Sequence, residues 1–301
     1  MFLLGFQFGL RLCGESELFP IKMASNLLRG ERMVTFSKDR QDQTGTKEWS
    51  DRSYNICLGC EHCCLYCYAR SIRCWSDESM RRPGAWQDQR LNPNRNRLGE
   101  EIRNAGVVMF PSSHDITPAF LPQAIQTIRN LLKTNKVLIV SKPHVRVVKR
   151  LCSEFAENKN DILFRFTIGA LNRKLCLYWE PGAPSPTQRI KALAHAYDQG
   201  FATSVSCEPF LDTVDQTCEL VDRVSPFVSD TIWVGKMRRI PRKLNSHVPG
   251  LLDAIHVLRA NQTDAEILRL VSQLSNQPKV RWKDSIRAVL AKADAQNCSR
   301  N

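Results

Sequence analysis

Short apolar runs rich in β-branched residues alternate with amphipathic stretches through the middle of the chain. The apolar runs lie at residues 107–113, 136–142, 162–170, 202–210 and 230–237. Between them, stretches such as AFLPQAIQTIRNLLKT and PTQRIKALAHAYDQG carry apolar residues at helical spacing, and the second closes on Gly200, a residue typical of helix ends. This alternation predicts strands joined by helices, and therefore a parallel sheet with right-handed crossovers.

A further strand is expected near residues 53–57, which brings the number of βα units to six. Six units exceed half of a dinucleotide-binding fold and fall short of an eight-stranded barrel. The predicted fold is therefore α/β, a partial (βα)6 TIM-type barrel of parallel strands. In such a sheet, functional side chains gather at the carboxyl ends of the strands.

Three regions with different patterns divide the chain. Residues 1–50 are irregular and mostly polar after an apolar start, and are predicted to form an N-terminal extension. Residues 51–245 hold the alternating pattern and form the predicted core domain. Residues 246–301 carry three amphipathic stretches, which predict a C-terminal helical segment packed over one open side of the sheet.

Basic residues outnumber acidic ones. Of 301 residues, 43 are Lys or Arg and 30 are Asp or Glu, which leaves a net charge of +13. This excess suits nucleic acid, because each neutralised phosphate releases counterions; the alternative is charge that serves solubility alone. The opening MFLLGFQFGL has no basic region before it and is too short to span a bilayer. We therefore expect a cytoplasmic protein without a membrane partner, with Met23 as an alternative start.

Cysteines crowd one short segment. Six of the 12 lie between Cys57 and Cys74, and in a reducing compartment clustered thiols are more often metal ligands than disulfide partners. The spacing is too tight for the usual structural zinc site, which joins two separated pairs. Three thiolates suit a [4Fe–4S] cluster in which one iron lacks a cysteine. Because Cys57 and Cys63 also form C-x-x-C pairs, the spacing alone leaves the choice of ligands open.

The string GCEHCCLYCYAR, residues 59–70, resembles the cysteine loop of the radical S-adenosylmethionine (radical SAM) enzymes, C-x3-C-x-aromatic-C after the first strand. The fuller string is similar to the branch typified by spore photoproduct lyase, and the resemblance covers roughly residues 50–240. It implies that Cys60, Cys64 and Cys67 hold a [4Fe–4S] cluster whose open iron binds S-adenosylmethionine. It further implies reductive cleavage of that cofactor to a 5′-deoxyadenosyl radical, with electrons from an external flavodoxin- or ferredoxin-like donor.

The resemblance also assigns cofactor contacts outside the cysteines. It implies that Ser113, Lys142 and Thr167 bind S-adenosylmethionine at strand ends, as does Tyr66 within the loop. The bare sequence leaves alternatives open, because Ser113 could instead cap the following helix and Lys142 could be solvated. Spore photoproduct lyases carry a hydrogen-donating cysteine where this chain has Ser112, and this departure argues against photoproduct lyase activity itself.

Charged residues at three strand ends are the predicted catalytic groups. They are Asp115, Glu208 and Lys236, which follow the second, fifth and sixth predicted strands. Alternation along the fourth strand places Arg165 and Thr167 on one face. Arg165 lies within an apolar run and needs a carboxylate partner if it is buried, for which Asp115 or Glu208 is a candidate.

An arginine-rich stretch follows the cysteine loop. Residues 70–98 hold seven arginines together with Trp75 and Trp86. Arginine binds phosphate through paired hydrogen bonds and tryptophan stacks on bases, so the stretch is a candidate nucleic-acid surface. An ordinary solvated helix and loop is the alternative.

The expected function is therefore that of a radical SAM enzyme, lyase-like or modifying, which acts on a nucleic-acid base. Two alternatives stay open. One is the same radical chemistry on a peptide or small metabolite, and the other is a non-catalytic iron–sulfur or zinc protein that binds nucleic acid. The sequence indicates no oligomeric state.

Overall fold

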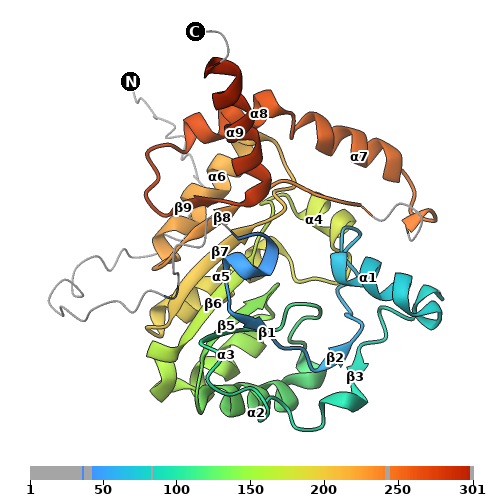
Figure 1. Cartoon of the computed structure of the whole chain (residues 1–301), viewed down its shortest axis with the longest axis vertical. Coiled ribbons are helices and arrows are strands. Elements are labelled where there is room, and N and C mark those ends of the chain that lie inside the picture. Colours follow the sequence, from blue (N-terminus) through green and yellow to red (C-terminus); the bar gives the residue numbers. More distant parts are fainter. Residues whose placement is uncertain (1–35, 37–42, 83, 241–244, 299–301) are drawn as a thin grey trace, which may run out of the picture. The chain divides into compact units, whose positions relative to one another are not determined.

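A parallel sheet of seven strands runs through the computed structural model, which describes residues 36, 43–82, 84–240 and 245–298 (Figure 1). In spatial order the strands are β1 (Arg52–Ser53), β4 (Val107–Phe110), β5 (Lys136–Ser141), β6 (Ile162–Thr167), β7 (Ala202–Cys207), β8 (Ile232–Val234) and β9 (Val280–Trp282). Every neighbouring pair is parallel. A second sheet of two antiparallel strands, β2 (Cys57–Leu58) and β3 (Arg90–Leu91), lies next to the cysteine loop.

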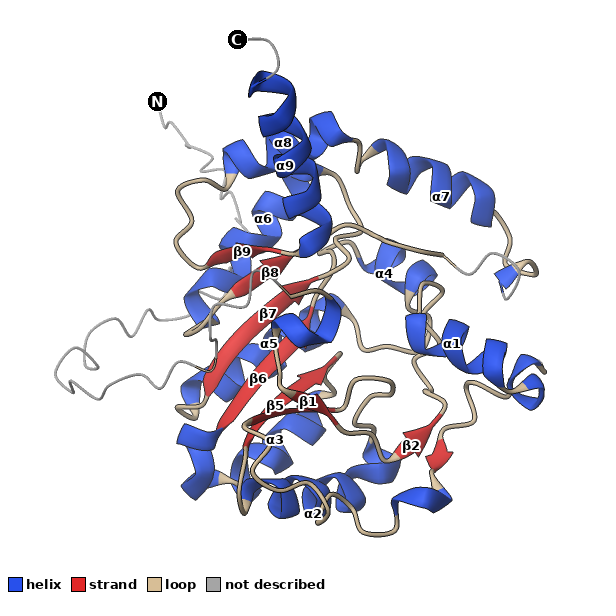
Figure 2. Ribbon diagram, viewed as in Figure 1, coloured by secondary structure: helices blue, strands red, loops and turns tan. Residues whose placement is uncertain are grey.

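Helices connect the strands as the sequence predicts (Figure 2). They are α1 (Tyr68–Ser76), α2 (Leu121–Leu132), α3 (Val145–Glu154), α4 (Arg173–Trp179), α5 (Pro186–Asp198), α6 (Val214–Val224), α7 (Leu251–Ala260), α8 (Asp264–Gln273) and α9 (Asp284–Cys298). Gly200 follows α5 with a φ of +80°, a left-handed conformation that glycine adopts without strain. The prediction of an α/β fold with a partial TIM-type barrel is confirmed.

The sheet has one strand more than the six predicted. Val280–Trp282 pairs with β8 and extends the sheet into the segment for which only helices were expected. A run of three residues is too short to carry a recognisable alternation, because a period of two needs four or more positions to stand out. The three helices predicted in this segment are present as α7, α8 and α9.

The two faces of the sheet differ in chemistry. Phe164, Phe166 and their equivalents on neighbouring strands point outward into the main hydrophobic core under the covering helices. Cys207 lies on this outer face and is fully buried there, as a small apolar side chain. The inner face begins with apolar residues such as Leu138 and Leu163 and becomes polar toward the carboxyl ends of the strands. The alternation that the sequence predicts for β6 is confirmed.

Arg165 on the inner face of β6 has partners other than the predicted ones. Its guanidinium lies 3.4 Å from Asp230 and donates to Ser204 Oγ at 2.9 Å. It also stacks over the ring of Trp49, 4.7 Å from the centroid. The expected pairing with Asp115 or Glu208 is wrong, because the partner is Asp230, which precedes β8 at the amino end of that strand, whereas Asp115 and Glu208 follow the carboxyl ends of β4 and β7. None of the helices described here is long and apolar enough to cross a membrane.

Candidate functional site

The cysteine loop between β2 and α1 is held on one side by the turn that precedes β3. The amide of Cys60 donates to the carbonyl of Trp86 at 2.7 Å. Gly59 has a φ of +78°, and a Cβ there would lie 2.6 Å from that same carbonyl oxygen. Both the backbone conformation and the close approach therefore require glycine at this position.

On its other side the loop packs against the segment that follows α4. The amide of Gly182 donates to the carbonyl of His62 at 3.0 Å, and a Cβ on Gly182 would lie 2.1 Å from the carbonyl of Glu61. The amide of Leu65 donates to the carbonyl of Trp179, and the Asn245 side chain donates to the carbonyl of Leu65. Because the loop backbone is fixed from both sides, its thiols are preorganised.

Cys60, Cys64 and Cys67 lie near one another within this loop. Burial raises the pKa of each thiol, that of Cys64 to about 12, and a charge on one of them raises the pKa of another. Cys67 also caps α1, where its Sγ accepts from the amide of Arg70. Three thiolates on one short loop suit a four-iron cluster, in which each thiolate binds a different iron atom.

The two other cysteines in question have different surroundings. Cys57 lies in β2, is 4% exposed and belongs to the main hydrophobic core. Cys63 has a φ of +46°, and burial raises the pKa of its thiol while the charge of Arg70 lowers it. The assignment of Cys60, Cys64 and Cys67 as the ligands stays the prediction that the resemblance implies.

A buried group of charges lies beside Cys64. The ammonium of Lys142, which follows β5, is 3.9 Å from Glu180 and 5.5 Å from the centre of the Tyr66 ring. Glu180 also accepts from the Tyr66 hydroxyl and pairs with Arg189 at 2.5 Å. Burial favours the neutral amine, but Cys64 and Glu180 outweigh burial and hold the pKa of Lys142 above its usual value. Lys142 is therefore protonated beside the cysteine loop.

Asp115 anchors the carboxyl ends of β4 and β5 to the cysteine loop. It accepts from the Ser141 hydroxyl and from the Lys142 amide at 2.7 Å, and lies 3.2 Å from Nδ1 of His62. Burial alone would raise the pKa of Asp115, but His62 and the hydrogen bonds hold it well below its usual range. With the amide of Ile116 also donating to it, its acceptor sites are occupied, so its role in this structure is to position its neighbours.

The rim of the site connects the cysteine loop to the end of β4. The side-chain oxygen of Asn55 accepts from the amides of Ser112 and Ser113 at 2.7 and 2.8 Å. The Tyr68 hydroxyl donates to the carbonyl of Ser112 at 2.5 Å. Desolvation raises the pKa of Tyr68, and the nearby charges of Cys67 and Glu208 raise it further.

The remaining predicted residues lie farther along the sheet. Thr167 ends β6, and its carbonyl accepts from Arg189 at 3.2 Å. Glu208 is 3.3 Å from the buried ammonium of Lys283, and burial raises the pKa of the Glu208 carboxyl. The ammonium of Lys236 is 3.6 Å from Asp264, at the start of α8. The structure thus brings Tyr66, Lys142 and Asp115 to the cysteines, leaves Glu208 at the end of β7 beside Lys283, and pairs Lys236 with α8.

Arg189 belongs to the site and was not predicted from the sequence. It lies in the first turn of α5 and is completely buried. A cation in the first turn of a helix faces the positive end of the helix dipole, which is unfavourable unless a carboxylate compensates. An arginine so close to the start of a predicted helix was therefore the sequence signal for a buried ion pair. Glu180, in the preceding loop, is the carboxylate that compensates it.

Comparisons with known proteins address the fold. No family model matches the chain. An uncharacterised protein of Acidianus two-tailed virus, ORF301, is 29% identical over 180 residues, which is 54% of this chain and only 57% of that relative's length. The solved structure of spore photoproduct lyase complexed with dinucleoside spore photoproduct is 14% identical, with a TM-score of 0.51 over 76% of this chain and 75% of the lyase. A variant of that lyase with bound AdoMet and the same dinucleoside gives a TM-score of 0.50 at 14% identity, over 78% and 76%. The resemblance expected from the cysteine loop is thus confirmed at the level of the fold: this chain has the fold of spore photoproduct lyase, a radical SAM enzyme.

Proposed function

We propose that this protein is a radical SAM enzyme that holds a [4Fe–4S] cluster on Cys60, Cys64 and Cys67. The observation that carries the proposal is the position of these thiols, on one fixed loop at the carboxyl edge of a parallel sheet and beside the protonated Lys142. When bound there, the cluster supplies the electron that cleaves S-adenosylmethionine into methionine and a 5′-deoxyadenosyl radical.

The residues around the loop suit the charges of that cofactor. Lys142 is only loosely paired with Glu180, at 3.9 Å, so its ammonium can bind the carboxylate of S-adenosylmethionine. Tyr66 lies against Lys142, and Thr167 and Ser113 lie at the adjacent strand ends. These three are the further cofactor contacts in our proposal.

The three predicted catalytic residues differ in how well their surroundings suit such a role. Glu208 is the strongest candidate, because its side chain is 22% exposed and it acts electrostatically on Tyr68 at the rim. Asp115 acts as a positioning residue, since its oxygens are occupied by donors from the chain. Lys236 has to leave Asp264 before it can meet a substrate.

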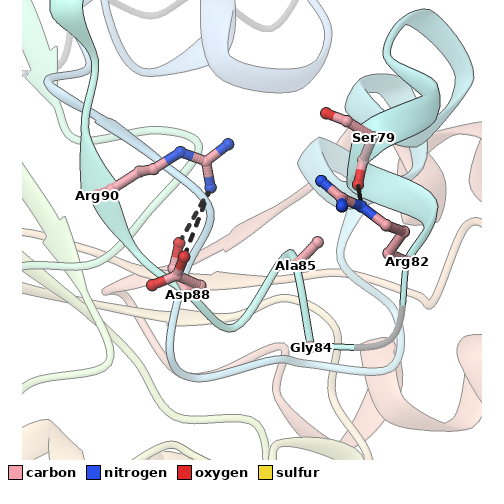
Figure 3. Close-up of a pocket in the computed structure, with 6 residues that line it drawn as sticks. All are labelled: Ser79, Arg82, Gly84, Ala85, Asp88 and Arg90. Carbon is pink, nitrogen blue, oxygen red and sulfur yellow. Dashed lines mark hydrogen bonds and ion pairs between the residues drawn. The ribbon is translucent and has the colours of Figure 1, made fainter.

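We further propose a nucleic-acid base as the substrate. The net charge of +13 supports a polyanionic partner, and α1, which begins at the cysteine loop, exposes Tyr68, Ile72 and Trp75 on one side by 54%, 63% and 83%. Beyond α1, Figure 3 shows a pocket lined by Arg82 and Arg90. The expectation that Trp86 stacks on bases is wrong, because this side chain is buried, 5% exposed.

The arginines of this surface hold local contacts that a phosphate can replace. Arg90 lies 4.0 Å from the carboxylate of Asp88, and Arg82 donates to the carbonyl of Ser79 at 3.3 Å (Figure 3). Exposed ion pairs of this kind contribute little to stability, so exchanging them for phosphate contacts costs little. A cytoplasmic location and an external flavodoxin- or ferredoxin-like electron donor complete the proposal.

The first experiment is anaerobic reconstitution with iron and sulfide, followed by dithionite and S-adenosylmethionine. We expect 5′-deoxyadenosine by chromatography from the unchanged protein and from Cys218→Ala, a thiol on α6 far from the loop, and none from Cys64→Ala. A protein that binds a full cluster and forms no 5′-deoxyadenosine would support the non-catalytic alternative. Separate incubation with DNA, RNA and peptides then distinguishes the substrate classes.

A further inference from the structure

A second set of ligating side chains, which includes no thiol, joins the cysteine loop to the start of α3. Glu61, His62 and His144 each offer one ligand atom, and these atoms all lie within 4.8 Å of one another. The two Nε2 atoms of the histidines are 3.1 Å apart, and Nε2 of His144 is 3.7 Å from Oε1 of Glu61. The set joins the cysteine loop to the residue that precedes α3.

The contact between His62 and Asp115 directs a lone pair of His62 into this set. Its Nδ1 lies 3.2 Å from Oδ2 of Asp115, a carboxylate that already accepts from Ser141 and from the amide of Lys142. Because Asp115 only accepts, a neutral His62 ring that keeps this contact carries its proton on Nδ1, which leaves the lone pair on Nε2. A carboxylate that fixes a histidine in this way is the usual support of a metal-ligating imidazole.

The surroundings of the three groups suit a cation that is reached from solvent. His62 is 1% exposed, whereas the side chains of His144 and Glu61 are 26% and 42% exposed, so the inner ligand is fixed and the outer two are accessible. Two nitrogens at about 2.0–2.1 Å from one tetrahedral ion lie about 3.3 Å apart, close to the separation observed here. Without an ion, the two Nε2 atoms need a shared proton at the same place.

We propose that Glu61, His62 and His144 bind a divalent first-row transition cation, and that this site is separate from the iron–sulfur site. Two imidazoles and a carboxylate suit zinc, with water in the remaining position. The cation links the cysteine loop to the start of α3 and so fixes the loop from a third side. The site needs no cysteine and does not depend on the proposed radical chemistry.

The test uses the reconstituted, cluster-loaded protein with one equivalent of Zn²⁺, followed by desalting. We expect about one zinc per chain by elemental analysis and, at the zinc X-ray absorption edge, only nitrogen and oxygen ligands at about 2.0–2.1 Å. A zinc–sulfur distance of about 2.3 Å would overturn the proposal, because it would assign the metal to the thiols. Protein that retains no zinc would overturn it as well and would leave a hydrogen bond between the two histidines.

Variants connect the bound metal to these residues. His144→Ala and, independently, Glu61→Gln should weaken zinc binding at least tenfold in competition with a chromophoric chelator, while the iron content stays unchanged. His256→Ala, an exposed histidine on α7, is the matched control and should retain the zinc. Since Glu61 is at the surface, its variant tests the site even if His144→Ala folds poorly. Undiminished zinc affinity in both variants would contradict the assignment.

Discussion

Two groups of buried charges on the inner side of the sheet are similar in composition and differ in what they connect. The site cluster consists of Tyr66, Lys142, Glu180 and Arg189, and the end cluster consists of Glu48, Glu208, Lys283 and Arg287. In each, one carboxylate with a fully buried side chain, Glu180 or Glu48, faces two cations. A buried carboxylate without such partners would be too costly to keep ionised.

The difference lies in which parts of the chain supply the charges. The site cluster is assembled around the cysteine loop, and its Lys142 is loosely held, at 3.9 Å from Glu180. The end cluster joins Gly45–Glu48, near the start of the described chain, to residues around the start of α9, and Lys283 there also donates to the carbonyl of Gly45 at 3.1 Å. The first cluster can offer a cation to a ligand, whereas the ion pairs of Glu48 in the second fasten distant segments together and leave Glu208 as its partly exposed carboxylate. Buried charge by itself therefore does not identify an active site.

The largest expected effect comes from breaking the end cluster. Lys283→Met leaves Glu48 with Arg287 and deprives Glu208 of its partner, and losing one member of a buried pair costs about 3–5 kcal/mol of unfolding free energy. Urea denaturation measures this loss. Lys292→Met is the control, because its pair with Asp264 is exposed and contributes about 0–1 kcal/mol. A loss below 1 kcal/mol for Lys283→Met would mean that the end cluster does not fasten the fold.

Breaking the site cluster at Lys142 should affect binding rather than folding. In Lys142→Met, Glu180 keeps Arg189 and Tyr66 as partners, so we expect the unfolding free energy to change much less than in Lys283→Met. A hydrogen bond to a charged group contributes about 1.5–3 kcal/mol, so the affinity for S-adenosylmethionine should fall about ten- to hundredfold. Isothermal titration calorimetry measures the affinity.

Arg189→Met is the matched variant within the same cluster. Arg189 is completely buried and holds Glu180 and the carbonyls of Pro184 and Thr167, so this change should destabilise the protein. If both variants lost only stability, Lys142 would serve the fold as the end cluster does, and its assignment as a cofactor contact would be wrong.

The sequence could predict the part of this comparison that depends on local pattern. The strands β4 to β8 follow from apolar runs, and Lys142 and Glu208 were found because they end such runs. The partners of those residues could not be found in that way. Lys283 pairs with Glu48 across 235 positions of the chain, and only the closed sheet brings them together. The strand β9, on which Lys283 depends, is too short to be recognised by its pattern.

Solvent exposure of aromatic side chains also distinguishes the region around the cysteine loop from the end cluster. Trp75 on α1 is 83% exposed, and stacking of a base on an aromatic side chain is worth about 1–3 kcal/mol. Trp75→Ala should therefore weaken binding of a fluorescent single-stranded oligonucleotide about fivefold or more and leave the unfolding free energy within about 0.5 kcal/mol. Leu177→Ala, an exposed apolar residue on α4, is the control. Equal affinities of both variants would remove α1 from the proposed surface.

Mild acid should also lower the stability of the region around the cysteine loop, because a histidine there is buried in its neutral form. His114 accepts from the amide of Ile56 at 3.1 Å, and burial lowers its pKa to about 4 from the 6.5 of a free side chain. Between these two values the unfolded chain binds a proton that the folded chain does not, so stability falls as the pH is lowered from 6.5 to 4.

For one such group the slope of stability against pH approaches, but does not exceed, about 1.4 kcal/mol per pH unit. Urea denaturation at pH 7, 6 and 5 measures it for the unchanged protein and for His114→Gln, which replaces the imidazole by an amide that does not titrate. We expect the variant to be less stable at pH 7 and to show a shallower slope. An unchanged slope would assign the acid sensitivity to other groups. The hydrogen bond between Ile56 and His114 would then not distinguish the region around the cysteine loop by proton uptake. Only the ligand-accessible charge of the site cluster would separate it from the end cluster.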